Sequence, residues 1–293
     1  MRLLFTGGSS PLGAGVLRGL AEDGRYAELW CGVHRRGVPF EHPKLRRVPL
    51  ALEGAVSLDA VPAPLDLVVH FAGLTHARDE RRYWEVNRRG TVRLAGAARA
   101  KGCRRFVYVS TRCATEGSGA YGESKLAAER DLRAMEWESL LILRPAEVYG
   151  GGGAEGVDKF LRTAERFRVV PLLWGDRRLR FAPLRADDFV SAAVGLIKNM
   201  GPGARTVEVC GPEELSGAEL GWRIARRKGA LPVPVWWPGL EVALRALGRV
   251  GLHAVEPDQI ARLTGRKTAS RPTPDPALAR PLARFMEKDV NRG

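Results

Sequence analysis

The chain has 293 residues, of which 45 % are hydrophobic and 27 % charged, and a formal net charge of +14. These proportions exclude wholesale disorder, and the length suits one large α/β domain or two smaller ones. The sequence has no run of about 18 uncharged apolar residues and therefore predicts no membrane-spanning helix.

The first residues lack the apolar core of a signal peptide, and the four cysteines are scattered without CxxC spacing. We therefore expect a cytoplasmic protein with free thiols and no metal site. The basic residues are spread along the chain rather than gathered into a block or an aromatic-interleaved stripe. A basic surface favours anionic partners such as phosphates or acidic lipid headgroups, and the scattered pattern argues against nucleic-acid binding.

Hydrophobic patterning predicts strands alternating with helices through the first half of the chain. Strands are expected at residues 2–5, 29–33, 45–50, 65–71, 106–110 and 140–143, and helices at 15–21, 84–100 and 121–135. The run at 65–71 is continuously apolar, as in a sheet covered on both faces. The fold class is therefore α/β, a Rossmann-like, doubly wound parallel sheet.

The texture changes after Tyr149, where Gly150 begins a glycine-rich break. Residues 181–197 look like another strand and helix that return to the first domain, and 206–209 like a short strand. Residues 271–281 are proline-rich and are expected to run as extended surface chain. The predicted division is 1–150 plus about 181–200 for one domain, and 151–180 plus 201–293 for a smaller, mostly α domain.

A glycine-rich turn follows the first strand, with the spacing Gly7-x-x-Ser10-x-x-Gly13. A strand, a glycine turn and a helix N-terminus together present free backbone N–H groups to a pyrophosphate. The alternative is a tight βα turn with no ligand. Its place at the start of a βαβ pattern favours the dinucleotide site.

Tyr121 and Lys125 are four residues apart on a predicted helix and so share a face. A cation held close to a phenol favours the phenolate and makes tyrosine usable as an acid/base. Ser110 and Thr111 end the preceding strand, where a hydroxyl could hold the substrate oxygen. An exposed Tyr/Lys pair that arises by chance is the alternative.

Six motifs in order resemble the extended short-chain dehydrogenase/reductase family, and more narrowly its NAD-dependent epimerase/dehydratase branch that acts on nucleotide sugars. The resemblance covers about residues 1–200. The motifs are Thr6-Gly7…Gly13, Asp66-x-Val68-Val69-His70-x-Ala72-Gly73, Asn87-x-x-Gly90-Thr91, Val109-Ser110-Thr111, Tyr121-x-x-x-Lys125 and Arg144-Pro145-x-x-Val148-Tyr149-Gly150.

The resemblance implies that the first predicted domain binds a dinucleotide and the second a substrate. Tyr121 would be the catalytic acid/base and Lys125 would hold the nicotinamide ribose, with Thr111, or Ser110 as second choice, orienting the carbonyl. The implied cofactor-binding residues are Gly7, Ser9, Ser10, Pro11, Leu12, Gly13, His34, Arg35, Arg36, Phe71, Ala72, Gly73, Asn87, Tyr121, Lys125, Pro145 and Val148, and the implied substrate-binding residues are Thr75 and Arg180.

The sequence departs from the family pattern after the second strand. Enzymes that prefer NAD usually carry an acidic residue there, but this chain has His34, Arg35 and Arg36. Guanidinium groups suit a 2′-phosphate, which favours NADP over NAD, although both arginines could be plain surface residues. Residues 48–51 lack the Asp that often binds adenine. Arg112 and Cys113 stand where sugar 4,6-dehydratases carry Asp-Glu, which disfavours that reaction.

Two features of the second half are open to more than one interpretation. Arg180 could clamp a nucleotide diphosphate or belong to a solvated basic face. Trp236 and Trp237, next to a basic amphipathic helix, could meet a membrane surface, but internal packing or a dimer contact is favoured.

The sequence thus predicts an NADP-dependent oxidoreductase that reduces a keto group of a nucleotide sugar. One alternative is an NAD-dependent nucleotide-sugar 4-epimerase, and another is a non-catalytic NADP-binding structural subunit. Reduction of a non-sugar carbonyl compound also stays open. The resemblance implies a homodimer.

Overall fold

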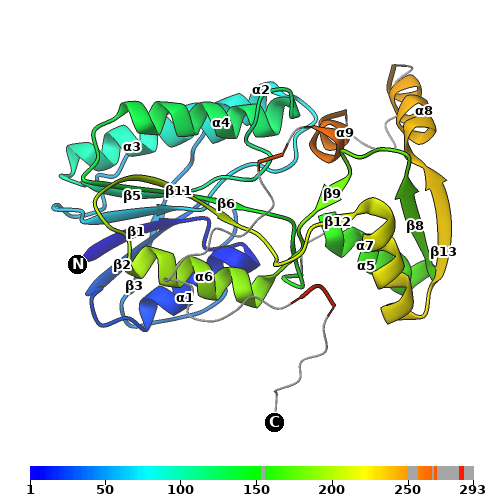
Figure 1. The fold of residues 1–293 in the computed structure, drawn as a ribbon. Helices are drawn as coiled ribbons and strands as arrows, with labels where there is room; N and C mark the ends of the chain where they lie inside the picture. Colours follow the sequence, from blue (N-terminus) through cyan, green and yellow to red (C-terminus); the bar gives the residue numbers. More distant parts are fainter. Residues whose placement is uncertain (153–155, 250–256, 266, 269–283, 287–293) are drawn as a thin grey trace, which may run out of the picture.

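The larger part of the chain is built on a seven-stranded sheet in which all strand pairs are parallel (Figure 1). The computed structural model describes residues 1–152, 156–249, 257–265, 267–268 and 284–286. The strand order is β11-β6-β5-β4-β1-β2-β3, which confirms the predicted doubly wound sheet. The strands are β1 (Arg2–Thr6), β2 (Glu28–Val33), β3 (Leu45–Pro49), β4 (Leu67–His70), β5 (Arg105–Val109), β6 (Ser139–Pro145) and β11 (Gly203–Val209).

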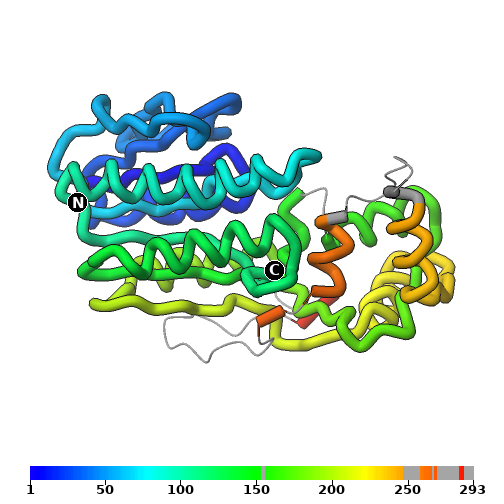
Figure 2. Tube along the Cα trace, turned by 90° about the horizontal axis from the view of Figure 1, so that it is seen from above, coloured from blue at the N-terminus to red at the C-terminus, as the bar shows by residue number. Residues whose placement is uncertain are grey.

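Helices cover both faces of this sheet, as Figures 1 and 2 show. One face carries α1 (Pro11–Ala21) and α6 (Ala186–Lys198), and the other carries α3 (Thr91–Ala100) and α4 (Gly119–Ala134). Neighbouring residues of β1 divide between the two cores: Leu3 and Phe5 pack towards α1 and α6, and Leu4 packs towards α3 and α4. This alternation follows from the pleat of a strand, whose successive side chains point to opposite faces.

The predicted helix at 84–100 differs in its first half. A short helix α2 (Arg81–Tyr83) leads into a π-helical segment η1 (Trp84–Gly90), and only then does α3 begin. Asn87, in the middle of η1, binds both polar backbone groups of Leu74, at 2.7 Å and 3.0 Å. Gly90 lies so close to Leu52 that an added β-carbon would sit 2.6 Å from its carbonyl oxygen.

The smaller part packs helices on a pair of parallel strands, at the right of Figure 1. Its elements are α5 (Gly156–Phe167), β8 (Val169–Trp174), α7 (Gly217–Lys228), β13 (Leu231–Trp236) and α8 (Trp237–Arg249). Two short strand pairs join β7 (Val148–Tyr149) to β10 (Leu184–Arg185), and β9 (Arg180–Phe181) to β12 (Leu215–Ser216). The last described helix, α9 (Pro257–Thr264), packs against α4 of the larger part.

One predicted boundary needs correction. The strand expected at 206–209 was assigned with the second domain, but β11 pairs with β6 from Gly203 to Val209 and so forms the edge of the main sheet. The reason is that α6 packs on a face of this sheet, so the chain that follows α6 can pair with the free edge of β6 as β11. The rest of the predicted division stays a prediction.

The two adjacent tryptophans have different surroundings. Trp237 is 3 % exposed and packs in the core of the smaller part, whereas Trp236 is 55 % exposed. A membrane or dimer contact of Trp236 stays a prediction. In the described ranges, none of the helices is long and apolar enough to cross a membrane. The predicted extended chain at 271–281 lies outside the described residues.

Candidate active site

The glycine-rich turn between β1 and α1 brings backbone close to backbone. Gly7 has a φ of 82°, and a β-carbon added there would lie 2.6 Å from the amide nitrogen of Ala72. A β-carbon at Gly13 would overlap the carbonyl oxygen of Gly7. The Ser10 hydroxyl donates to that carbonyl at 2.9 Å and accepts from the Gly13 amide at 3.1 Å, which caps α1.

This turn fits a dinucleotide pyrophosphate. No side chain at Gly7, Gly8 or Gly13 can stand between the backbone and a ligand, and the first turn of α1 carries no acidic residue. The N–H groups at the start of α1 and the positive end of its dipole therefore suit an anion, and the first turn itself carries no competing carboxylate. The residues present suit the nicotinamide dinucleotide that the motif predicts.

A cavity of about 210 Å³ opens beside this turn, at the carboxyl ends of β1, β2 and β4. Six predicted cofactor-binding residues line it: Gly7, Ser9, His34, Arg35, Ala72 and Gly73. Arg36 is exposed and does not line the cavity. Of the two neighbouring arginines, Arg35 therefore lines the cavity and Arg36 does not.

Sequence reasoning missed several cavity residues, among them Glu53 and Arg82, which form a 2.6 Å ion pair. Arg82, with help from Arg35 and His34, holds the pKa of Glu53 below its ordinary value. Glu53 lies just beyond residues 48–51, where the adenine-binding Asp was sought. No motif signals the pair, because its partners are far apart in sequence and belong to different segments.

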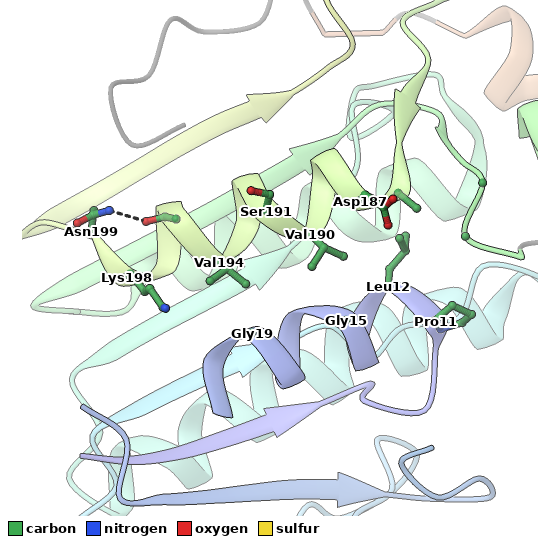
Figure 3. A pocket seen from close by; sticks show the side chains of 14 residues that line it. Pro11, Leu12, Gly15, Gly19, Asp187, Val190, Ser191, Val194, Lys198 and Asn199 are labelled. Carbon is green, nitrogen blue, oxygen red and sulfur yellow. Dashed lines mark hydrogen bonds between the residues drawn. The ribbon is translucent and has the colours of Figure 1, made fainter. Parts of the chain in front are cut away.

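Other predicted cofactor residues lie outside this cavity. Pro11 and Leu12 line a groove of about 740 Å³ between α1 and α6, where Gly15 and Gly19 lie opposite Val190 and Val194 (Figure 3). Phe71 stacks on Phe5 and packs against the core, as Val148 does. The Asn87 side chain is hydrogen-bonded to the backbone of Leu74, and the Pro145 carbonyl accepts a hydrogen bond from the Arg112 amide.

Lys125 is buried at the centre of the larger part. Its ammonium donates to the Val109 carbonyl at 2.7 Å and lies 4.3 Å from the centre of the Tyr108 ring. A β-carbon added at Gly73 would come within 3.5 Å of the Lys125 Nζ, so the cation borders the cavity wall. Burial lowers the pKa of Lys125 to about 7, although Glu129 partly opposes this shift.

Tyr121 lies one helical turn before Lys125, near the start of α4. Its ring meets the ring of Tyr83 edge-on, with centroids 5.9 Å apart, and the Arg262 guanidinium lies 4.2 Å from its centroid. Its backbone amide donates to Oδ1 of Asp258 at 2.9 Å. Sequence reasoning predicted the Tyr121–Lys125 pair but not these two residues of α9, which no local spacing connects to Tyr121.

The two hydroxyl residues after β5 differ in their contacts. Ser110 donates to Oε1 of Glu129 at 2.5 Å, and Arg144 also binds Glu129, at 2.6 Å. The Thr111 hydroxyl accepts from the Cys113 amide at 3.2 Å. Thr111 can still donate its proton to a substrate oxygen, whereas the Ser110 proton is engaged by a buried carboxylate.

Arg180, the predicted diphosphate-binding residue, is hydrogen-bonded to other residues through its backbone carbonyl. Its carbonyl accepts from buried Arg112 at 3.3 Å and from Lys267 at 2.6 Å, while the residue itself is exposed. Arg112 also binds Glu147. Burial raises the pKa of Glu147, but Lys267 and Arg112 outweigh it and keep this pKa below its usual value.

Thr75 is the other predicted substrate-binding residue. Its carbonyl accepts a hydrogen bond from Arg262.

Comparisons with known proteins agree with this geometry. A sequence model described as "NAD dependent epimerase/dehydratase family" matches residues 3–210. The chain is 33 % identical over 200 residues to the ceramide reductase of Caulobacter vibrioides (strain NA1000 / CB15N), a match that covers 66 % of this chain and 60 % of that protein. It is 31 % identical over 228 residues to the 2-alkyl-3-oxoalkanoate reductase of Stenotrophomonas maltophilia (strain K279a), covering 70 % and 67 %.

The fold is also similar to that of solved structures. The structure of MoeE5 in complex with UDP-glucose and NAD aligns with a TM-score of 0.67 at 24 % identity, covering 80 % of this chain and 85 % of that chain. At this identity the likeness shows the fold alone. The match to the ceramide reductase spans about three fifths of that protein's length.

Proposed function

Because the chain belongs to the NAD dependent epimerase/dehydratase family, we propose that it is an NADP-dependent oxidoreductase that reduces a keto group. The observation that carries this proposal is the buried Lys125 one helical turn from Tyr121, beside a glycine turn fitted to a pyrophosphate. Burying a lysine is costly, so a fold that does so, with the Val109 carbonyl as the hydrogen-bond acceptor of its ammonium, points to a function for it.

Each residue has a defined task in this proposal. The turn from Gly7 to Gly13 and the N-terminus of α1 hold the pyrophosphate. A nicotinamide dinucleotide, when bound, supplies or accepts the hydride. Tyr121 gives its hydroxyl proton to the carbonyl oxygen during reduction, Lys125 in its protonated form places a positive charge beside it, and Thr111 donates a hydrogen bond to the same oxygen.

Preference for NADP is supported by Arg35, which lines the cavity together with His34. We expect Arg35→Ala to weaken NADPH binding about 10-fold or more while NADH binding changes little, because a lost charge-assisted contact to phosphate costs about 1.5–3 kcal/mol. Arg36→Ala is the matched control and should bind both cofactors like the parent. Nicotinamide fluorescence titrations measure the six dissociation constants, two for each variant and two for the parent.

The result also separates the alternatives. Equal effects of the two substitutions would remove the argument for NADP. NAD that co-purifies and resists exchange would favour the nucleotide-sugar 4-epimerase, and binding of neither cofactor would favour a non-catalytic subunit. The homodimer and the cytoplasmic location remain part of the proposal, and light scattering tests the former.

The expected substrate class is a nucleotide sugar with a keto group. One observation favours a second class: two similar proteins are named as a ceramide reductase and a 2-alkyl-3-oxoalkanoate reductase. The second candidate is therefore a ketone that carries long alkyl chains.

A direct assay distinguishes the two classes. NADPH oxidation is followed with a 4-keto-sugar nucleotide and, in parallel, with a 3-oxoalkanoate of long chain. Turnover of either that is abolished by Tyr121→Phe supports the reductase and names its class. Turnover that survives Tyr121→Phe would contradict the assigned role of this residue.

A further inference from the structure

Helix α9 reaches across from the C-terminal region and contacts the start of α4 at Tyr121. Asp258, which is 4 % exposed, accepts the Tyr121 amide with Oδ1 at 2.9 Å and the Nε of Arg262 with Oδ2 at 2.7 Å. One carboxylate therefore joins the backbone of Tyr121 to the guanidinium that lies over its ring. Asp258 also accepts an amide in the first turn of α4, where a negative charge stabilises a helix.

Arg262 is held in place by several partners at once. Its Nη2 donates to the Thr75 carbonyl at 2.5 Å and to the Tyr83 hydroxyl at 3.2 Å. Its guanidinium carbon lies 4.2 Å from the Tyr121 ring centroid and 6.0 Å from that of Tyr83. These contacts hold the guanidinium over the Tyr121 ring, which is in contact with both Tyr83 and Arg262.

Helix α9 packs closely against the start of α4. Gly119, the first residue of α4, has a φ of 86°, and a β-carbon there would lie 2.8 Å from Asp258 Oδ1 and 3.0 Å from Ala261. Gly265, which follows α9, is similarly close to Ser118. Both glycines allow α9 to approach closer than a side chain would permit, which brings the ion pair onto Tyr121.

We propose that α9 is a working part of the active site, in which Asp258 and Arg262 are positioning residues that orient Tyr121 and place a second positive charge beside it. The proposal rests on the proposed function in that Tyr121 is the acid/base. It adds that the C-terminal region, beyond all six family motifs, sets the reactivity of this residue.

The electrostatic consequence has a definite sign. Among the described residues, the charged or titratable groups around Tyr121 include Lys125 on α4, Tyr83 on α2, Tyr108 on β5, and Asp258 with Arg262 on α9. Burial and the charges of Asp258 and Tyr121 act on Arg262 in opposite directions, and its pKa is raised overall. Attraction is mutual, so loss of Arg262 raises the pKa of Tyr121.

Ultraviolet difference titration of phenolate in the purified protein tests this without any substrate. The Tyr121 signal is the difference between the parent and Tyr121→Phe, and again between Arg262→Ala and its double variant with Tyr121→Phe. We expect the Tyr121 midpoint to move to higher pH in Arg262→Ala and to return towards the parent value in Arg262→Lys. An unchanged midpoint would overturn the proposal.

A kinetic test accompanies the titration once a substrate is found. Arg262→Ala should lower kcat about 10-fold or more through misplacement of Tyr121, with NADPH affinity unchanged and the alkaline limb of reduction shifted to higher pH. Arg245→Ala on α8, which breaks a comparable i,i+4 pair with Glu241, is the control and should change none of these. Equal kcat losses in Arg262→Ala and Arg262→Lys at an unchanged pH profile would indicate a purely structural role.

The two proposals can fail separately. If Arg262→Ala does not fold, Arg262→Gln takes its place, and the same shift to higher pH is expected because it also removes the positive charge. Activity that is insensitive to Tyr121→Phe would contradict the proposed function, while the titration would still decide whether α9 controls Tyr121.

Discussion

The ammonium of Lys125 is buried 2.7 Å from the Val109 carbonyl, and burial lowers its pKa to about 7. The unfolded chain keeps this proton up to a pH of about 10.4. Between these two values the unfolded state binds more protons, so stability rises with pH across this window. Below about pH 7 the folded protein carries the full cost of a buried charge.

We therefore expect Lys125→Met to abolish at least about 99 % of the proposed reductase activity, by the scale of acid–base catalysis, and yet to raise the Tm. The gain in Tm should be largest below pH 7 and shrink by pH 9. Thermal unfolding at several pH values measures it, with the exposed Lys159→Met as a control that should leave activity and Tm nearly unchanged. A lower Tm for Lys125→Met at pH 6 would contradict the account.

At this scale the sequence predicted the residues whose spacing is local. The four-residue interval between Tyr121 and Lys125 and the glycine turn could be found because each motif lies within one turn or helix. Glu129 continues the same interval, so a third polar residue on this helix face was visible, but its partners Ser110 and Arg144 come from two other segments. Such contacts depend on strand neighbours and not on spacing.

Glycines in helices α1 and α3 differ in how closely other residues approach them. On α1, a β-carbon at Gly19 would lie 2.8 Å from Val194 of α6, a stiff β-branched side chain. On α3, Gly96 is exposed, with nothing within 4 Å of the same position. A helix interior favours alanine over glycine by about 1 kcal/mol unless packing opposes it.

We expect Gly96→Ala to stabilise the protein by about 0.5–1 kcal/mol and Gly19→Ala to destabilise it by about 1–2 kcal/mol through overpacking. Adding Val194→Ala to Gly19→Ala should recover part of that loss, since it removes the clashing methyl groups. Denaturant unfolding measures all three. Stabilisation by Gly19→Ala would show that α1 and α6 separate at no cost.

Element boundaries were predicted less well than element types. The alternation of strands and helices fixed the sheet, because buried parallel strands are continuous apolar runs. The π-helical segment η1 has no signal in apolar spacing, since it arises where Asn87 binds the Leu74 backbone. The exposed start of β11 likewise hides its place in the main sheet.

At the scale of the whole molecule, described residues of the C-terminal region contact both parts at the candidate active site. Lys267 binds the Arg180 carbonyl, Thr268 binds the Arg112 carbonyl, and α9 covers Tyr121. These contacts link residues more than 80 positions apart. The family motifs end before this region, which explains why the sequence predicted a binding domain but not what closes over it.

The net charge of +14 acts at longer range on a cofactor that is itself an anion. NADPH carries one phosphate more than NADH, so its attraction to a basic protein is stronger and is screened more by salt. Between about 0.01 M and about 0.1 M salt the Debye length falls from about 30 Å to about 10 Å. We expect the dissociation constant for NADPH to rise about 3-fold to 10-fold over this range, and that for NADH to rise less. Fluorescence titration at both salt concentrations measures the two slopes, and Arg35→Ala should bring the NADPH slope close to that of NADH. Identical slopes in the parent protein would mean that the extra phosphate lies away from the basic residues of the cavity, and that Arg35 does not select the cofactor.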